Sequence, residues 1–211
     1  MFKRLLYQIP AWLQWFYRGV MWRGEAATPI VYITFDDGPI PEVTPRILDI
    51  LREKNVHATF FLVGDNVAKY PHLYQRILTS GHRVGNHTFH HIKGWRTGTD
   101  AYLADVEHCN KVLGYGAGKP PLFRPPYGRI RTSQKVRLLR RGYKLVLWDV
   151  LTHDYNKSYT PELMLDIVKR YTRPGSIIVF HDSLKSGDRM LATLPKVIDY
   201  LRAQGYIFDT L

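Results

Sequence analysis

Two acidic residues, Asp36 and Asp37, stand side by side in the run T-F-D-D-G-P. The apolar, strand-like stretch Ile30–Ile33 lies shortly before them. Adjacent carboxylates at the end of a buried strand are unfavourable, because two like charges close together resist joint ionisation. A shared cation or a shared proton would offset that cost. The pair therefore indicates a site for metal binding, proton transfer or both.

His87 and His91 offer two imidazoles with three residues between them. If the segment forms a helical turn, both side chains point the same way. A histidine pair alone is weak evidence, but with one of the two carboxylates it makes a three-ligand metal site that leaves room for water and substrate. Zinc is the default metal, and Fe²⁺, Co²⁺ and Ni²⁺ also suit these ligands. The second carboxylate is then free for proton transfer, and His90 would point away from the pair.

Two further residues have both the chemistry and the setting for catalysis. Arg124 precedes two prolines, which stiffen the loop and lack an N–H, so that the next backbone donor is that of Tyr127. A guanidinium here can hold a neighbouring carboxylate in its ionised form. His181 follows the apolar run Ile177–Phe180, where its pKa can be tuned for acid–base work. The remaining histidines are expected to be structural or solvated: His57, His72, His82, His108 and His153.

These residues follow strand-like runs that alternate with helix-like segments. The runs are dense in apolar residues, which is typical of a parallel sheet buried on both faces, and the alternation predicts an α/β fold with right-handed crossovers. The predicted strands are Ile30–Phe35, Ala58–Val63, His82–Gly85, Pro121–Arg124, Tyr143–Trp148, Ser176–Phe180 and Tyr206–Asp209. Predicted helices open at Thr44-Pro45 and Thr160-Pro161, each as N-cap and first-turn proline, and cover Leu73–Thr79, Thr99–Leu113, Ser133–Arg141 and Met190–Ala203.

The unusual polar residues all fall at the C-terminal ends of predicted strands. In a parallel barrel those ends share one face, where active sites lie. Structural polar residues would have no reason to choose the same end repeatedly, so the convergence indicates an enzyme. The groups are Asp36 and Asp37, His87 and His91, Arg124 to Gly128, Asp149 and Asp154, and His181 with Asp182.

The composition is that of a globular protein. At 211 residues, with 45% apolar and 23% charged residues, the chain fits one domain with a real core, and we expect a monomer. The single cysteine, Cys109, excludes a disulfide framework and a cysteine-type zinc site. The net charge is +12, and Arg129–Lys144 is basic without a single acid. This run suits a polyanion or a solvated helix face. No nucleic-acid motif accompanies it, so we expect no nucleic-acid partner.

Residues 1–27 form an amphipathic segment rich in aromatic and basic residues, and residues 28–211 form the predicted domain. Apolar residues from Leu5 to Met21 follow a helical period, but the uncharged stretch Leu5–Tyr17 is too short to span a bilayer. No cleavage site for a signal peptide follows it. The segment therefore either makes peripheral membrane contact through residues 1–24 or covers one end of the domain. We expect a cytoplasmic or peripherally membrane-associated protein.

The motifs, taken in order, resemble those of the NodB-homology polysaccharide deacetylases, carbohydrate esterase family 4. Thr34–Pro39 matches T-F-D-D-G-P, His87–His91 matches H-[ST]-x-x-H, Arg124–Tyr127 matches R-x-P-[YF], and Val179–His181 stands in the place of L-x-H. The resemblance covers Ile30–Leu211 and leaves residues 1–27 outside. It implies a distorted, partly open (β/α)7 barrel.

The fourth motif departs from the family pattern, which reads close to W-D-x-D-x-x-D-W. Here Leu151 replaces the middle aspartate and Tyr155 replaces the final tryptophan. Asp154 is the aspartate that carries over, and in the family it tunes the catalytic histidine. The two changes concern the sugar-binding wall rather than the metal chemistry.

The resemblance implies metal-dependent removal of acetyl groups from N-acetylated amino sugars in a poly- or oligosaccharide, which could be anionic. The implied metal ligands are Asp37, His87 and His91, and the implied catalytic residues are Asp36 as base, Arg124 as its anchor, and His181 as acid, oriented by Asp154. The backbone N–H of Tyr127 would stabilise the oxyanion, and the implied substrate-binding residues are Tyr127, Tyr155 and Val179.

Other functions stay open. The same fold could carry a metal amidase for a formyl group, a nucleobase ring or a lipid-linked sugar, or a non-catalytic glycan-binding module. Two histidines and one carboxylate would also serve an iron oxygenase. The sequence does not choose between peptidoglycan, chitooligosaccharide and lipid-linked or envelope sugars.

Overall fold

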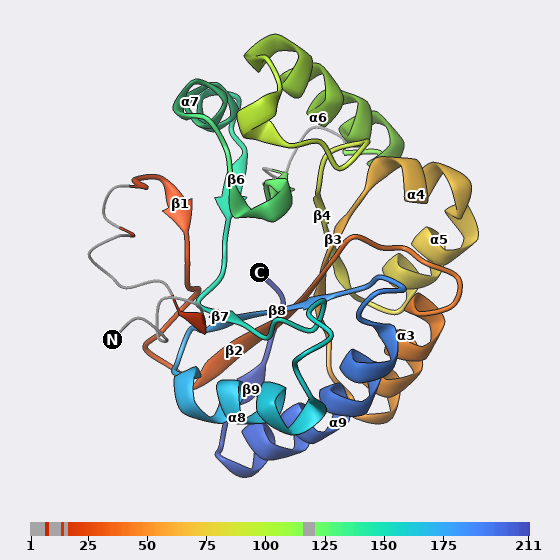
Figure 1. Ribbon diagram of the computed structural model, residues 1–211, viewed down its shortest axis with the longest axis vertical. Helices are drawn as coiled ribbons and strands as arrows, with labels where there is room; N and C mark the ends of the chain where they lie inside the picture. The colour runs from red at the N-terminus through yellow and green to blue at the C-terminus, as the bar shows by residue number, and fades with distance from the viewer. Residues whose placement is uncertain (1–6, 9–13, 15–16, 116–120) are drawn as a thin grey trace.

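The computed structural model describes residues 7–8, 14, 17–115 and 121–211. The strands form one curled sheet, and the helices lie around its outer face (Figure 1). All pairs of named strands are parallel, in the order β1-β6-β5-β4-β3-β2-β8-β7, with β9 added to the start of β2. No pairing joins β1 to β7 among the described residues, so the barrel is open on that side. The predicted fold, a distorted and partly open parallel barrel, is confirmed.

The predicted strands are present with shifted ends, and two short strands are additional. The strands are β1 (Val20–Met21), β2 (Ile30–Asp36), β3 (Thr59–Leu62), β4 (Arg83–Asn86), β5 (Leu122–Phe123), β6 (Lys144–Val146), β7 (Val150–Leu151), β8 (Ile177–His181) and β9 (Ile207–Phe208). β7 was not predicted, because only two residues pair with β8 after the chain leaves β6.

The helices follow the predicted places, with one addition, α4. They are α3 (Thr44–Glu53), α4 (Gly64–Lys69), α5 (Pro71–Thr79), α6 (Thr99–Leu113), α7 (Thr132–Arg140), α8 (Pro161–Tyr171) and α9 (Gly187–Ala203), with 3-10 turns at Gly94–Arg96 and Pro126–Gly128. Thr160 caps α8 as predicted, because its Oγ1 accepts a hydrogen bond from the N–H of Leu163. The predicted Thr44 cap is wrong. Thr44 is the first residue of α3, and its hydroxyl donates to Asp182 Oδ2 at 2.6 Å.

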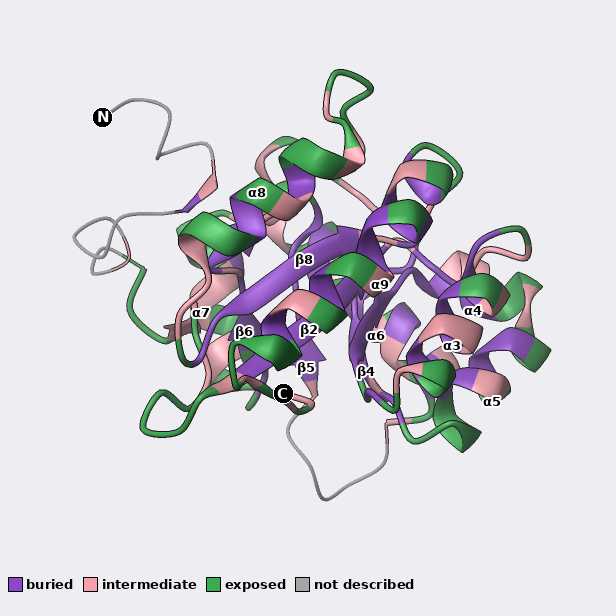
Figure 2. Ribbon diagram, turned by 90° about the horizontal axis from the view of Figure 1, so that it is seen from below, coloured by how far each residue is buried: buried purple, intermediate pink, exposed green. Residues whose placement is uncertain are grey.

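The sheet is held by apolar side chains on its faces. Figure 2 shows the strands almost entirely buried and the helices buried along one side. Phe35 of β2 stacks on Phe60 of β3 and on Phe180 of β8, with ring centroids 4.9 Å and 6.0 Å apart, and all three rings are fully buried. This packing fixes the central strands, and with them the residues at their C-terminal ends.

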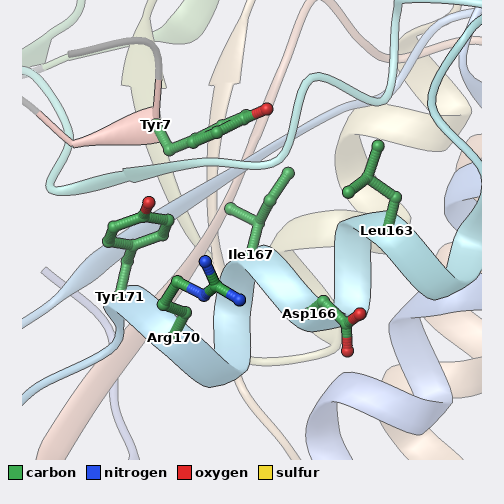
Figure 3. Close-up of a pocket in the computed structure, with 6 residues that line it drawn as sticks. All are labelled: Tyr7, Leu163, Asp166, Ile167, Arg170 and Tyr171. Atoms are coloured by element: carbon green, nitrogen blue, oxygen red, sulfur yellow. The ribbon is translucent and has the colours of Figure 1, made fainter. Parts of the chain in front are cut away.

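The described part of the N-terminal segment lies against the domain. Val20 and Met21 pair with β6, so the predicted helical period is wrong at these two residues, where the sheet edge supplies hydrogen-bond partners. Gln8 Nε2 donates to Asp149 Oδ1 at 3.2 Å, and the Tyr7 ring stacks 5.7 Å from that of Tyr171 at the end of α8 (Figure 3). Of the rest of the predicted helix, residues 5–6, 9–13 and 15–16 lie outside the described residues.

These contacts are what an end-covering segment would make, and peripheral membrane contact stays a prediction. Within the described ranges, no helix is both long enough and apolar enough to cross a membrane.

Candidate active site

Polar residues from several strands meet in one pocket of about 480 Å³ at the C-terminal ends of the sheet. The predicted convergence is therefore observed for Asp36, Asp37, His87, His91, Tyr127 and His181. The residues that line the pocket are Asp36, Asp37, His87, His91, Tyr127, Trp148, Leu151, Tyr155, His181, Ser183 and Lys185.

Asp37, His87 and His91 bring three potential metal ligands together. Their ligand atoms all lie within 4.8 Å of one another, and Asp37 Oδ1 is 3.6 Å from His87 Nε2 and 3.2 Å from His91 Nε2. Burial would raise the pKa of Asp37, but its hydrogen bond with His91 and the nearby imidazoles hold that pKa well below its usual range. The three residues thus present one carboxylate and two imidazoles to a common point.

The histidine pair reaches this geometry without a helix. The segment after β4 is an irregular loop, with φ values of 65° at Thr88 and 53° at His91. The predicted helical turn is therefore wrong, although the two side chains do meet. Asp37 has a φ of 84°, so strained backbone occurs at two of the three candidate ligands. Such strain persists only where surrounding structure enforces it, and it concentrates at functional sites.

His87 is prepared to act as a neutral metal ligand. Its Nδ1 lies 2.7 Å from the carbonyl oxygen of Arg124, so Nδ1 carries the proton and Nε2 presents a lone pair towards Asp37. Burial lowers the pKa of His87 to about 4, which keeps the ring neutral at physiological pH. A backbone acceptor on the far nitrogen is the usual way in which proteins orient a metal-binding histidine. The two imidazoles and the carboxylate, with the hydrogen bond that orients His87, therefore fit a divalent metal such as zinc.

Asp105 of α6 holds the loop that carries the two histidines. Its Oδ2 accepts hydrogen bonds from the backbone N–H groups of Phe89 (2.8 Å) and His90 (3.1 Å), and its Oδ1 pairs with the His90 ring. Asn86 Oδ1 accepts from the N–H of Thr88 at 2.7 Å. His90 thus points away from the pair, as predicted, and helps to anchor the loop.

Asp36 is held by a buried ion pair with Arg124. The Arg124 Nη1 atom donates to Asp36 Oδ1 at 2.6 Å and to Thr34 Oγ1 at 2.9 Å, and Nη2 donates to the carbonyl of Leu147 at 3.1 Å. The guanidinium also lies 4.0 Å from the Phe61 ring centroid and is fully buried. Burial lowers the pKa of Arg124 and the Asp36 charge opposes that effect. The pair keeps Asp36 fixed beside the three candidate ligands.

His181 forms a second charged pair in the same pocket. Its Nδ1 lies 2.7 Å from Asp154 Oδ1, and its backbone N–H donates to Asp154 Oδ2 at 2.6 Å. Burial alone would lower the pKa of His181, but the Asp154 carboxylate, together with the charges of Asp37 and Asp36, raises this pKa to about 9. His181 is therefore protonated at neutral pH and can donate a proton.

Tyrosines form two walls of the pocket. The Tyr127 ring is 4.9 Å from that of His91, and the Tyr155 ring is 5.0 Å from that of His181.

The role of Val179 in substrate binding stays a prediction, and the structure shows where its side chain lies. Alternate residues of a strand share a face, so Val179 lies on the same face of β8 as His181 but two residues deeper in the barrel. There its side chain is fully buried, and it is not among the residues that line the pocket. Leu151, its register partner in β7, does line the pocket. Leu151 therefore presents an apolar side chain to the pocket at this level of the barrel.

The polysaccharide deacetylase family model matches residues 23–146, which is more than half of the chain. The chain belongs to the polysaccharide deacetylase family. The resemblance found in the sequence is thereby confirmed, and with it the interpretation of the chain as a hydrolase of carbon–nitrogen bonds other than peptide bonds.

Relatives of similar length support this assignment. The chain is 33% identical over 195 residues to a peptidoglycan-N-acetylglucosamine deacetylase of Bacillus cereus, covering 91% of each chain. It is 33% identical over 194 residues to a chitooligosaccharide deacetylase of Azorhizobium caulinodans, covering 86% of this chain and 92% of the relative. A crystal structure of a peptidoglycan N-acetylglucosamine deacetylase superposes with a TM-score of 0.87 at 33% identity, covering 95% of this chain and 94% of that one.

In this deacetylase the sequence did not single out every residue of the pocket. Trp148, Ser183 and Lys185 also line it. Trp148 faces Gly128, which has a φ of 65° and where an added Cβ would lie 2.4 Å from the indole. Gly128, directly after the R-x-P-Y motif, is the feature of the sequence that could have predicted this contact. Only glycine lets the loop approach the indole of Trp148 so closely. Ser183 and Lys185 carry no comparable sequence signal.

Asp149 and Asp182 stand at strand ends but do not line the pocket. Arg173 binds Asp149 with two hydrogen bonds, of 3.0 Å and 2.7 Å, so Asp149 is structural. Burial raises the pKa of Asp182 to about 8, and its backbone N–H donates to the carbonyl of Asp36 at 2.7 Å. Asp182 therefore supports the backbone at Asp36.

The basic run after the third motif is used within the fold. Arg137 and Arg141, on and after α7, pair with Asp100 and Glu107 of α6. These contacts favour the interpretation of a solvated helix face with local ion pairs over that of a binding site for a polyanion.

Proposed function

We propose that this polysaccharide deacetylase uses a divalent metal to remove acetyl groups from N-acetylated amino sugars in a poly- or oligosaccharide, releasing acetate. One observation carries the proposal. Three potential metal ligands, an anchored carboxylate and a histidine paired with a carboxylate meet at a single pocket. Amide hydrolysis needs these three functions together: a polarised carbonyl, a base for water and an acid for the leaving amine.

Asp37, His87 and His91 would hold the metal. A divalent ion bound there, with zinc as the default and cobalt, nickel or iron(II) compatible with the same ligands, would supply Lewis-acid polarisation and a water of lowered pKa. The neutral His87 and the ionised Asp37 are already in the protonation states that a metal requires.

Asp36 would accept the proton of the attacking water. The Arg124 guanidinium occupies Oδ1 of Asp36 and leaves Oδ2 for this proton. With Oδ1 paired to Arg124, Asp36 would serve as the base of the reaction through its other carboxylate oxygen. Thr34 and Leu147 fix Arg124 in turn, so Asp36 enters the reaction with little freedom to rotate.

The oxyanion that forms on the acetamide would be met by the backbone of Tyr127. Pro125 and Pro126 precede this residue and restrict the loop, and Tyr127 itself has a φ of 61°. A donor that is fixed in advance stabilises developing charge without reorganisation, an effect worth about 10²–10³-fold in rate per donor. The Tyr155 ring would form part of the sugar-binding wall beside His181.

His181 would protonate the leaving amine, and this role predicts an alkaline limit to activity. Its pKa is raised to about 9, so the active, protonated form is lost as pH rises through about 9. Asp154→Asn removes the charge that contributes most to raising this pKa, and the alkaline limb of kcat should therefore move to lower pH. Profiles of kcat against pH for both proteins test this. An unchanged alkaline limb in Asp154→Asn would rule out His181 as the acid tuned by Asp154.

Acetate release tests the proposed activity itself. The purified protein is incubated with chitotetraose and with peptidoglycan glycan strands, and acetate is measured with and without a chelator. We expect acetate from at least one glycan and its loss on chelation. Release of formate or ammonia from other amides, with no acetate from any glycan, would instead favour a different amidase on this fold. Glycan binding without any product would favour a non-catalytic module.

A further inference from the structure

Lys185 is a charged residue of the pocket that the proposed mechanism does not use. It lies in the loop between β8 and α9, is exposed, and lines the same pocket as Asp36 and His181. Its Nζ is 5.6 Å from the centroid of the Tyr155 ring, which itself lies 5.0 Å from the His181 ring. The ammonium group therefore lies on the same side of the pocket as His181, where a substituent on a bound sugar could meet it.

The loop that carries Lys185 is held in place. Arg189 Nη2 donates to the carbonyl of Lys185 at 2.8 Å and to that of Asp154 at 2.8 Å, which ties the loop to the acid pair. Ser186 Oγ donates to the carbonyl of His181 at 3.0 Å and lies 2.7 Å from Ser183 Oγ. A fixed backbone limits the positions that the Lys185 side chain can reach, and it keeps the charge on the rim of the pocket.

No carboxylate neutralises Lys185 among the described residues. The ion pairs found in that part of the chain do not include it, and its identified side-chain contact is the ring of Tyr155. A lysine also lies over the other aromatic wall, where Lys93 Nζ is 5.3 Å from the centroid of the Tyr127 ring. Both tyrosine walls of the pocket thus have an ammonium group close to the ring, in a chain whose net charge is +12.

We propose that Lys185 recognises a carboxylate on the glycan, so that the enzyme prefers an N-acetylated strand that bears carboxylates to a neutral one. This inference rests on the proposed deacetylation and names the substrate class for the same site. The lactyl ether of a muramic residue and the ring carboxylate of a uronic acid would both present the required group. An ammonium on the rim attracts such a group by a charge-assisted hydrogen bond.

The test uses two forms of one substrate. Peptide-free strands of alternating N-acetylglucosamine and N-acetylmuramic acid are compared with the same strands after carbodiimide coupling to ammonia, which turns each carboxylate into a neutral amide of nearly the same shape. The wild-type kcat/KM for acetate release should be about 3- to 10-fold higher on the charged strands. A preference of this size lies between the contribution of an exposed ion pair and that of a charge-assisted hydrogen bond. Hyaluronan oligosaccharides, whose carboxylates belong to uronic acids, show which source the site prefers.

Lys185→Gln should lower this charged-to-neutral ratio towards one. Lys144→Gln is the matched control, because it removes the same charge from an exposed residue. Lys144 lies at the start of β6, which is the end of that strand remote from the pocket. This variant should keep the wild-type ratio. Equal rates on charged and neutralised strands, or a ratio that Lys185→Gln leaves unchanged, would overturn the inference while leaving deacetylation intact. Absence of acetate from every strand while chitotetraose is still deacetylated would also overturn the inference, whereas absence of acetate from chitotetraose as well would contradict the proposed function.

Discussion

Asp36→Asn is expected to lower the turnover number about 10²–10⁴-fold while leaving the bound metal in place, since this is the usual contribution of a positioned base. The new amide oxygen could still accept the hydrogen bond that Arg124 Nη1 now donates at 2.6 Å, but the amide could not take a proton from water. Because Asp36 is not one of the three clustered ligand residues, the metal content should not change.

The same substitution has a structural cost that must be measured separately. It removes the charge that faces a fully buried guanidinium, and breaking a buried ion pair costs about 3–5 kcal/mol of stability. Activity is therefore measured at a temperature where circular dichroism shows the variant folded, and metal content is measured on the same sample. Asp65→Asn, at a partly exposed carboxylate of α4 paired with Lys69, serves as the control. Near-native turnover in folded, metal-loaded Asp36→Asn would show that Asp36 is not the base.

His87→Ala should abolish both metal binding and acetate release. The substitution removes one of three ligands and leaves a cavity beside Asp37 and His91, so the remaining two residues cannot hold the ion tightly. Elemental analysis after dialysis against zinc should find little metal, and acetate release should fall to the background of metal-free protein.

His72→Ala is the matched control for this variant, because it makes the same chemical change at an exposed histidine of α5. Its zinc content and activity should equal those of the wild type. A His87→Ala protein that kept both its zinc and its turnover would place the metal elsewhere.

The sequence predicted which residues meet, but not the backbone that brings them together. The spacing of His87 and His91 suggested a helical turn, whereas the structure uses a loop with positive φ values that Asp105 anchors from α6. A local sequence pattern reports spacing, and the hydrogen bonds that enforce an irregular loop come from residues far along the chain. The parallel α/β sheet was predictable because buried strands and amphipathic helices leave periodic signals, whereas the partly open barrel was implied by the resemblance to the family.

The positions of residues that belong to no periodic pattern or motif could not be predicted from the sequence. Lys185 follows the last motif by a few positions, and only the folded loop places it over Tyr155. Val179 was assigned to the substrate because it opens a motif, but its depth in the barrel, which the motif does not report, buries its side chain completely. Val20 and Met21 looked helical in the sequence, yet the edge of β6 offers them a parallel partner.

We propose that one metal ion, held by Asp37, His87 and His91, makes this protein a deacetylase. Titration of the metal-free protein with Zn²⁺, with acetate release from an N-acetylated glycan as the readout, tests it most directly. We expect no release without metal, a linear rise with added zinc, and a plateau at one zinc per chain. Full acetate release from protein shown to be free of metal would contradict the claim.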